Sequence, residues 1–224
     1  MARFTHLIRP PRAGRAFLHL VPWLACALTP AAQAQVPDAA QRLVGAARSL
    51  LTTPYRFGGR LRHATDGIDC QGVLFYAAEH VGACGWRSYS VYPSQAIPAG
   101  ELGDAVPGLS PVRSSRLPIA DLRPGDVLWL VGPARNPAEP AIGAFDDGPV
   151  WVWHTGIYSG HGQWIVGDHF AGQVVETDLA SYLAVHADTY SGLVVTRLAP
   201  SPRPARCRHH ARMGSSLTRA TARP

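Results

Sequence analysis

A cysteine stands at the start of an apolar segment in the stretch GIDCQGVLFYAAEH. Apolar residues at helical spacing predict a helix over about residues 70–80 that begins at Cys70 itself. Unpaired N–H groups and the positive end of the dipole gather at a helix start, so a thiolate there is stabilised and the thiol pKa is expected to fall. The same N–H groups can receive a developing oxyanion. Cys70 is therefore a candidate nucleophile, with a small capping residue of a structural helix as the alternative.

A nucleophilic thiol needs a base, and the segment WVWHTGIYSG offers His154. Alternation in this predicted strand places His154 on the same face as Val152 and Gly156. A lone histidine on a strand is often structural, but beside Cys70 it can take the thiol proton and later return a proton to a leaving amine.

A third residue that orients the base is expected on the next strand, which ends in QWIVGDH. Period-2 alternation puts Asp168 on the face of Val166. A carboxylate there can accept the second imidazole N–H and fix the tautomer of His154. His169 points the other way unless Gly167 allows a bulge. We therefore expect Asp168 as the third catalytic residue, with His169 as its competitor.

The positive charge of the chain lies at its two ends. All 21 basic residues are arginines, and the formal net charge is +6. Four arginines, an apolar run of 13 residues and the small-x-small sequence AQA give residues 1–34 the layout of a secretory signal. That run is too short for a stable membrane span. We therefore expect export to the periplasm, the cell wall or the medium.

The middle of the chain has the opposite charge. Residues 35–198 hold 11 arginines and 15 acids, a balance of 11 − 15 = −4, whereas residues 199–224 hold 6 arginines and no acid. The basic ends alone give no footprint for nucleic acid. Residues 199–224 lack periodicity and are expected to be a disordered tail.

Removal of the signal leaves three cysteines, Cys70, Cys84 and Cys207. An odd number in an oxidising compartment leaves at least one thiol unpaired, and a bond between Cys84 and Cys207 would make that thiol Cys70. The three residues lack the paired spacing of a zinc site, and no phosphate-binding glycine loop is present. We therefore expect neither a metal nor a cofactor.

The 164 residues of 35–198 are enough for one domain with a single core. Helical patterns over 38–51 and 70–80 come first, with a short helix expected near residue 94. Strands are predicted over 127–131, 150–160, 163–169, 172–176 and 192–198, with a short helix at 179–183. Helices that lead an antiparallel sheet indicate an α+β fold.

Four motifs in this order, PYRFGG, DCQG, RPGDVLWL and HTGIYSG, resemble those of NlpC-type bacterial cell-wall cysteine peptidases, a branch of the papain-like folds. The resemblance covers residues 39–198. It implies a papain-like α+β fold, with the nucleophile Cys70 at a helix start and His154 as the base. It also implies that Tyr55 helps to form the site and that Asp69 holds the free amine of a peptidoglycan stem peptide.

The chain departs from that pattern at two positions of the site. Gln71 replaces the serine that usually follows the cysteine, so we expect a reshaped substrate pocket, and Val166 occupies the usual place of the third residue. We expect a monomeric, exported cysteine hydrolase that cleaves an amide bond in a stem peptide. The alternatives are a thiol-dependent amidase or acyltransferase on another small amide or ester, and a non-catalytic wall-binding module on the same fold.

Overall fold

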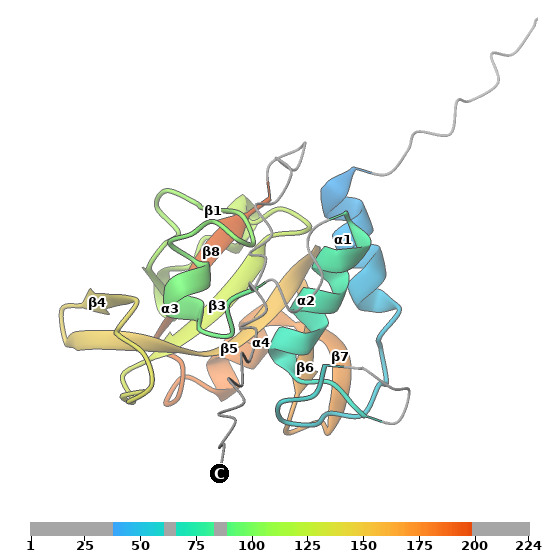
Figure 1. The fold of residues 1–224 in the computed structure, drawn as a ribbon. Coiled ribbons are helices and arrows are strands. Elements are labelled where there is room, and N and C mark those ends of the chain that lie inside the picture. Colours follow the sequence, from blue (N-terminus) through green and yellow to red (C-terminus); the bar gives the residue numbers. More distant parts are fainter. Residues whose placement is uncertain (1–37, 61–65, 83–88, 199–224) are drawn as a thin grey trace, which may run out of the picture. The chain divides into compact units, whose positions relative to one another are not determined.

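The computed structural model describes residues 38–60, 66–82 and 89–198 (Figure 1). The expected signal (1–34), the expected tail (199–224), Cys84 and Cys207 lie outside the described residues. The helices are α1 (Ala39–Arg48), α2 (Cys70–His80), α3 (Pro93–Ala96) and α4 (Leu179–Val185), with 3₁₀ turns η2 (Ser114–Arg116) and η3 (Ile119–Asp121). The strands are β1 (Asp104–Ala105), β2 (Val112–Arg113), β3 (Val127–Gly132), β4 (Gly143–Phe145), β5 (Gly148–Gly160), β6 (Gln163–Asp168), β7 (Gln173–Asp178) and β8 (Gly192–Arg197).

The first two helices begin where a side chain caps them. Asp38 accepts the N–H of Gln41 at 2.7 Å at the start of α1. Asp69 accepts the N–H of Gly72 at 2.7 Å at the start of α2, so the helix begins at Cys70 as predicted. None of the helices in the described ranges has the length and apolarity needed to span a bilayer.

All strand pairs of the described residues are antiparallel, in the order β1-β8-β3-β5-β6-β7, with β2 on β8 and β4 on β5. The predicted α+β fold is thus confirmed. Strands β1, β2 and β4 were not predicted, because a segment of two or three residues is too short to show alternation.

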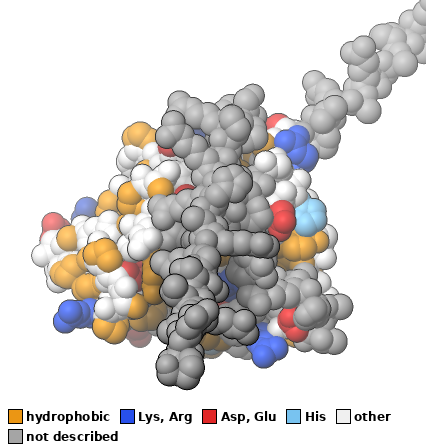
Figure 2. All heavy atoms as spheres, viewed as in Figure 1, with side chains coloured by type: hydrophobic (Ala, Val, Ile, Leu, Met, Phe, Trp, Pro, Cys, Tyr) orange, Lys and Arg blue, Asp and Glu red, His pale blue; other side chains and the backbone are white. Residues whose placement is uncertain are grey.

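The sheet buries a hydrophobic cluster on each face. Helices α1 and α2 lie side by side and pack on one face, whereas α4 packs on the other (Figure 1). Trp129 and Trp164, the largest of the fully buried side chains, lie on opposite faces. On the surface in the same view, acidic and basic side chains are interspersed among apolar ones, without a basic patch on the coloured residues (Figure 2).

The predicted alternation of β5 is wrong at Val152. Leu130 pairs with His154, but the next residue, Val131, pairs with Val152, so Trp153 is an extra residue in β5. This β-bulge moves Val152 to the face that carries α1 and α2, while His154 stays on the other face. The pattern of residue types along a strand does not reveal a bulge, because the extra residue of a bulge can be of any type.

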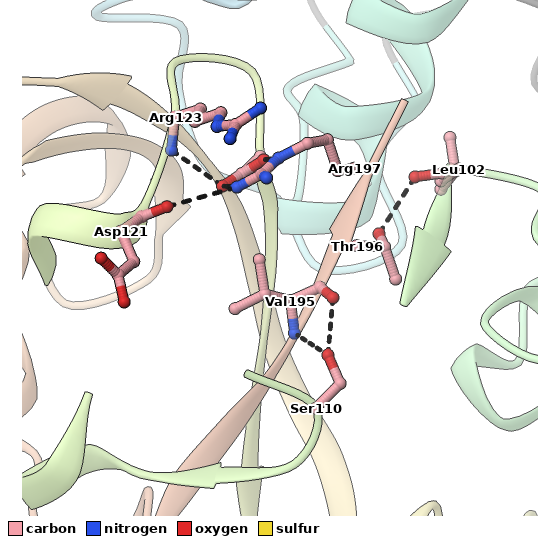
Figure 3. A network of polar contacts seen from close by, with 8 residues as sticks. Leu102, Ser110, Asp121, Arg123, Val195, Thr196 and Arg197 are labelled. Atoms are coloured by element: carbon pink, nitrogen blue, oxygen red, sulfur yellow. Dashed lines mark hydrogen bonds and ion pairs between the residues drawn. The ribbon is translucent and has the colours of Figure 1, made fainter. Parts of the chain in front are cut away.

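A group of buried polar contacts joins the start of β3 to the end of β8 (Figure 3). Asp126, from the RPGD turn, is fully buried and accepts two hydrogen bonds of 2.6 Å from Arg197 and one of 2.9 Å from the N–H of Arg123. Next to it, Thr196 accepts the Nε1–H of Trp129 at 3.1 Å and donates to the Leu102 carbonyl at 3.0 Å. We call Asp126, Arg197, Thr196 and Trp129 the β3–β8 network.

Candidate active site

A cavity of about 640 Å³ opens where the start of α2, the PYRFGG segment, β5 and the end of β6 meet. Of the candidate residues, it is lined by Tyr55, Asp69, Cys70, Gln71, His154 and His169, whereas Asp168 does not line it. Segments far apart in the sequence thus bring the proposed nucleophile, Cys70, and the proposed base, His154, to one site, although 154 − 70 = 84 positions separate them. Within the described ranges, no group of three or more His, Cys, Asp or Glu side chains is placed to hold a metal ion.

Two glycines let the backbone come close enough to place Cys70. A Cβ on Gly167 of β6 would lie 2.9 Å from the carbonyl carbon of Asp69 and 3.0 Å from the amide nitrogen of Cys70. A Cβ on Gly72 would lie 2.5 Å from the carbonyl oxygen of Gly59. A side chain at either position would come too close to this backbone. The two glycines therefore allow β6 and the PYRFGG turn to lie directly against the first turn of α2.

The thiol of Cys70 is half-buried and forms no disulfide with any described residue. Burial and the negative charge of Asp69 raise its pKa to about 12, against the lowering effects of N–H groups of Thr155 and Gln71 on the sulfur and of the Arg60 charge. The expected low pKa is therefore wrong for the free protein. The N–H groups at the helix start do act on the sulfur, but the apolar packing and the capping carboxylate outweigh them.

His154 is buried against aromatic rings. The ring of Trp164 meets it edge-on at 5.9 Å between centroids, and the ring of Tyr190 is stacked on it at 5.9 Å. Burial, with the charges of His169 and His186, lowers the pKa of His154 to about 3. In the free protein at neutral pH, a neutral imidazole therefore shares the cavity with a neutral thiol.

At and next to His154, three buried polar atoms lack a hydrogen-bond partner among the described residues. They are Nε2 of His154, Nε1 of Trp164 and the hydroxyl of Tyr182, which adjoins Tyr190 without acceptable hydrogen-bond geometry. The three rings are mutual neighbours, with centroids 4.8 to 6.1 Å apart. Buried polar groups are normally paired, so this cluster is an exception that distinguishes the surroundings of His154.

Strand β6 carries no bulge before Asp168. Val166, Gly167 and Asp168 pair with β7 in one continuous register, so Asp168 lies on the Val166 face, as alternation predicts. Its carboxylate is buried and accepts the N–H of Phe170 at 2.8 Å through Oδ1. The predicted register of Asp168 is therefore confirmed, but its carboxylate bonds to the backbone of Phe170, and Nε2 of His154 has no partner among the described residues.

His169 reaches the cavity by another route. It lies one residue beyond the end of β6, is exposed, and holds its ring 6.4 Å from that of His154 and 6.0 Å from that of Tyr55. The expectation that His169 needs a bulge to approach His154 is wrong, because the chain turns directly after Asp168 and strand alternation no longer applies there.

Tyr55 is fixed at the cavity by its backbone, whose N–H donates to the Gly172 carbonyl at 2.8 Å. Burial and the neighbouring acidic groups of Cys70, Asp69 and Asp168 raise the pKa of Tyr55 to about 12. Its hydroxyl therefore stays a neutral hydrogen-bond donor at any pH where the protein would work.

Arg60 is a cavity residue that the sequence reasoning did not select. Its guanidinium pairs with Asp69 at 2.5 Å and donates to Oε1 of Gln71 at 3.1 Å. Gln71 in turn donates to the Val91 carbonyl at 3.1 Å, which ties the start of α2 to the segment before α3. The only signal was the arginine directly after the two glycines of PYRFGG, and nothing in the local pattern shows which acid it meets.

No model of a known protein family matches the sequence, and no curated protein matches it. Solved structures similar to this chain include NlpC1 from Trichomonas vaginalis, at 18% identity and a TM-score of 0.47 over 74% of this chain and 46% of that one. The peptidoglycan hydrolase RipB from Mycobacterium tuberculosis is 22% identical, with a TM-score of 0.45 over 71% of this chain and 64% of that one. The NlpC/p60 domain of the peptidoglycan hydrolase SagA is 16% identical, with a TM-score of 0.43 over 71% of this chain and 98% of that one.

The chain thus spans less than two thirds of the length of NlpC1 and of RipB. Two of the three structures carry NlpC in their names and two are named peptidoglycan hydrolases, the kind of protein that the four motifs resemble. At these identities and scores, the function has to be argued from the site itself.

Proposed function

We propose that this protein is an exported cysteine hydrolase that cleaves an amide bond in peptidoglycan stem peptides. The observation that carries the proposal is the meeting of Cys70, at the start of α2, with His154, from β5, in one cavity. The backbone N–H of Thr155, the residue after His154, is close enough to the sulfur of Cys70 to lower the thiol pKa, so the two segments adjoin at the reacting atom. A wall-binding module would have no use for this pairing.

The chemistry begins from neutral groups. His154 takes the thiol proton as the sulfur of Cys70 attacks the carbonyl carbon of the substrate, and the N–H groups at the start of α2 receive the oxyanion. His154 then gives the proton to the leaving amine, the C–N bond breaks and a thioester remains. Water, deprotonated by His154, attacks the thioester, which releases the acid and restores the thiol.

The raised pKa of Cys70 and the lowered pKa of His154 determine at which step the thiol proton passes to the imidazole. A thiolate and an imidazolium are unfavourable in the free cavity, so the transfer has to accompany attack on a bound substrate. The N–H groups of Thr155 and Gln71 and the charge of Arg60 favour the thiolate at that moment.

For the residue that orients the base, we propose Asp168, with His169 as its competitor. Asp168 lies on the Val166 face of β6, and its charge reaches the tyrosines that flank His154, since it raises the pKa of Tyr182 and of Tyr190. Tyr55 and Gln71 are proposed to bind substrate, because both line the cavity that holds Cys70.

Digestion of purified peptidoglycan by the folded protein, followed by mass analysis of the fragments, tests the proposal. Cys70→Ser is expected to lower turnover by at least about 1000-fold, since loss of the nucleophile removes most of the catalysis in comparable hydrolases. Cys84→Ser is the matched control and is expected to keep turnover. Thermal unfolding of both variants checks that the fold survives.

Three results would contradict this function. Wild-type turnover by Cys70→Ser would end the cysteine-hydrolase proposal. Tight binding to peptidoglycan without any new fragment would favour the wall-binding module, while fragments that carry a transferred acyl group would favour the acyltransferase.

A further inference from the structure

The carboxylate of Asp69, directly before Cys70, is fully occupied within the protein. Oδ1 accepts the N–H of Gly72 at 2.7 Å, which caps α2. Oδ2 accepts the N–H of Gly58 at 2.9 Å and pairs with Arg60 at 2.5 Å. The side chain of Asp69 is 8% exposed and that of Arg60 is 12% exposed. The pair therefore forms part of the cavity wall and is not a loose surface contact.

Arg60 is held in place on three further sides. Its Nη1 donates to the Gly59 carbonyl at 2.9 Å, its Nη2 donates to Gln71, and its guanidinium carbon lies 5.6 Å from the ring centroid of Phe75. Moving Arg60 away from Asp69 would break all of these contacts and would therefore be unfavourable. The two charges cancel at the wall next to the nucleophile.

The remaining charges of the described cavity lie elsewhere. Glu139 is the other carboxylate among the described lining residues, and it accepts hydrogen bonds from Asn136 and from the N–H of Ser94 at the start of α3. The histidines that line the cavity are His154 and His169. A substrate ammonium placed beside Cys70 would lose water and meet an already neutralised acid, which is unfavourable.

We propose that Arg60 determines specificity: the cavity wall beside Cys70 accepts an uncharged, N-acylated peptide end and disfavours a free α-ammonium. The inference rests on the proposed function for the choice of peptide ligands. It opposes the role that the motif resemblance implies for Asp69, the holding of a free amine. A peptide whose N-terminus is still joined to another group through an amide has the chemistry that this wall fits.

The test uses two peptides of the same stem-peptide sequence, one with a free N-terminus and one N-acetylated. Their affinities for the full-length Cys70→Ala protein are measured by calorimetry, so that binding is read without turnover. At pH 6 the acetylated peptide is expected to bind at least about tenfold more tightly, a difference of about 1.4 kcal/mol. That preference should shrink as the pH rises through about 8, where an α-amine loses its charge.

Arg60→Gln in the same background removes the cation from Oδ2 of Asp69, which keeps the N–H of Gly58 and gains room for an ammonium. The preference for the acetylated peptide is expected to fall at least about tenfold, because an unpaired carboxylate then attracts the charged amine. Arg56→Gln is the matched control, since Arg56 is an exposed arginine of the same segment that does not line the cavity. It should leave the preference unchanged.

Two results for the Cys70→Ala protein overturn the inference. One is tighter binding of the free-amine peptide, and the other is equal or undetectable binding of both peptides. If Glu139→Gln then removes a free-amine preference, the ammonium binds at Glu139 instead. The wild-type protein is assayed for cleavage in parallel. The expected binding preference without any cleavage would refute the hydrolase function while the inference on the ligand stands.

Discussion

The cavity and the β3–β8 network are each built around a buried aspartate paired with an arginine, yet their surroundings differ. In the network, Asp126 has three hydrogen bonds, and the hydroxyl of Thr196 both donates and accepts. In the cavity, Asp69 and Arg60 also have all their hydrogen bonds. In the lining of the same cavity, however, Nε2 of His154 has no partner among the described residues. Complete pairing serves stability, whereas groups left available serve chemistry.

The largest effect is expected from a change on the cavity side that leaves the fold intact. If Asp168 orients His154 during the reaction as proposed, Asp168→Asn should lower turnover by roughly ten- to a thousand-fold, or about 1.4 to 4 kcal/mol, because an amide would present the wrong hydrogen-bonding partner to the imidazole. His169→Ala should cost much less. Turnover of both variants on one stem-peptide substrate decides between Asp168 and His169. Thermal unfolding, measured in parallel, checks that both variants are folded. A severe loss for His169→Ala beside a near-normal Asp168→Asn would assign the role to His169.

The corresponding change in the network should affect stability alone. Arg197→Met leaves Asp126 buried without its cation, and we expect a loss of about 3 kcal/mol in the free energy of unfolding, near the lower end for a broken buried pair. The lower end applies because 27% of the Arg197 side chain is exposed. Urea unfolding measures the loss, and turnover below the unfolding range should stay normal.

Arg113→Met is the matched control for Arg197→Met. Arg113 pairs with Asp147 at 2.6 Å on the surface, where solvent screens the charges, so no measurable change in stability is expected. Equal stability losses for the two arginine variants would remove the distinction between a structural and a surface pair.

The smallest and sharpest comparison removes one hydroxyl from each region. Thr196→Val should cost about 1 to 2 kcal/mol, because Nε1 of Trp129 and the Leu102 carbonyl both lose a partner. Tyr182→Phe should change stability by less than about 0.5 kcal/mol, because the hydroxyl that it removes has no well-formed hydrogen bond. A larger loss for Tyr182→Phe would show that the aromatic cluster is a structural network after all.

The parts of the molecule with a local signal could be predicted from the sequence. The cap and start of α2 follow from Asp69 and the apolar spacing after it, and the position of Asp168 follows from regular alternation in β6. The bulge at Trp153 could not be predicted, because it leaves composition unchanged. The same holds for the approach of His169, which depends on how the chain leaves β6.

The electrostatics of the site were the least accessible from the sequence. A helix start predicts a low thiol pKa, but the pKa of Cys70 is raised by apolar packing and by Asp69. Arg60 lies nine positions before Asp69, beyond a bend, and only the folded chain makes it a partner of that acid. Both facts depend on what surrounds a side chain in space, which periodicity does not record.

Asp69 both caps α2 and lines the cavity. These two roles limit which substitutions the protein can accept at this position. A substitution at Asp69 would loosen the first turn of α2 and move the nucleophile together with any change in ligand preference. Arg60 lies outside the helix and contacts the cap through its side chain, so a change there leaves the hydrogen bond that caps α2 in place. If Arg60 sets selectivity for the peptide end as proposed, that selectivity can change at position 60 while Asp69 continues to cap α2 and to position Cys70.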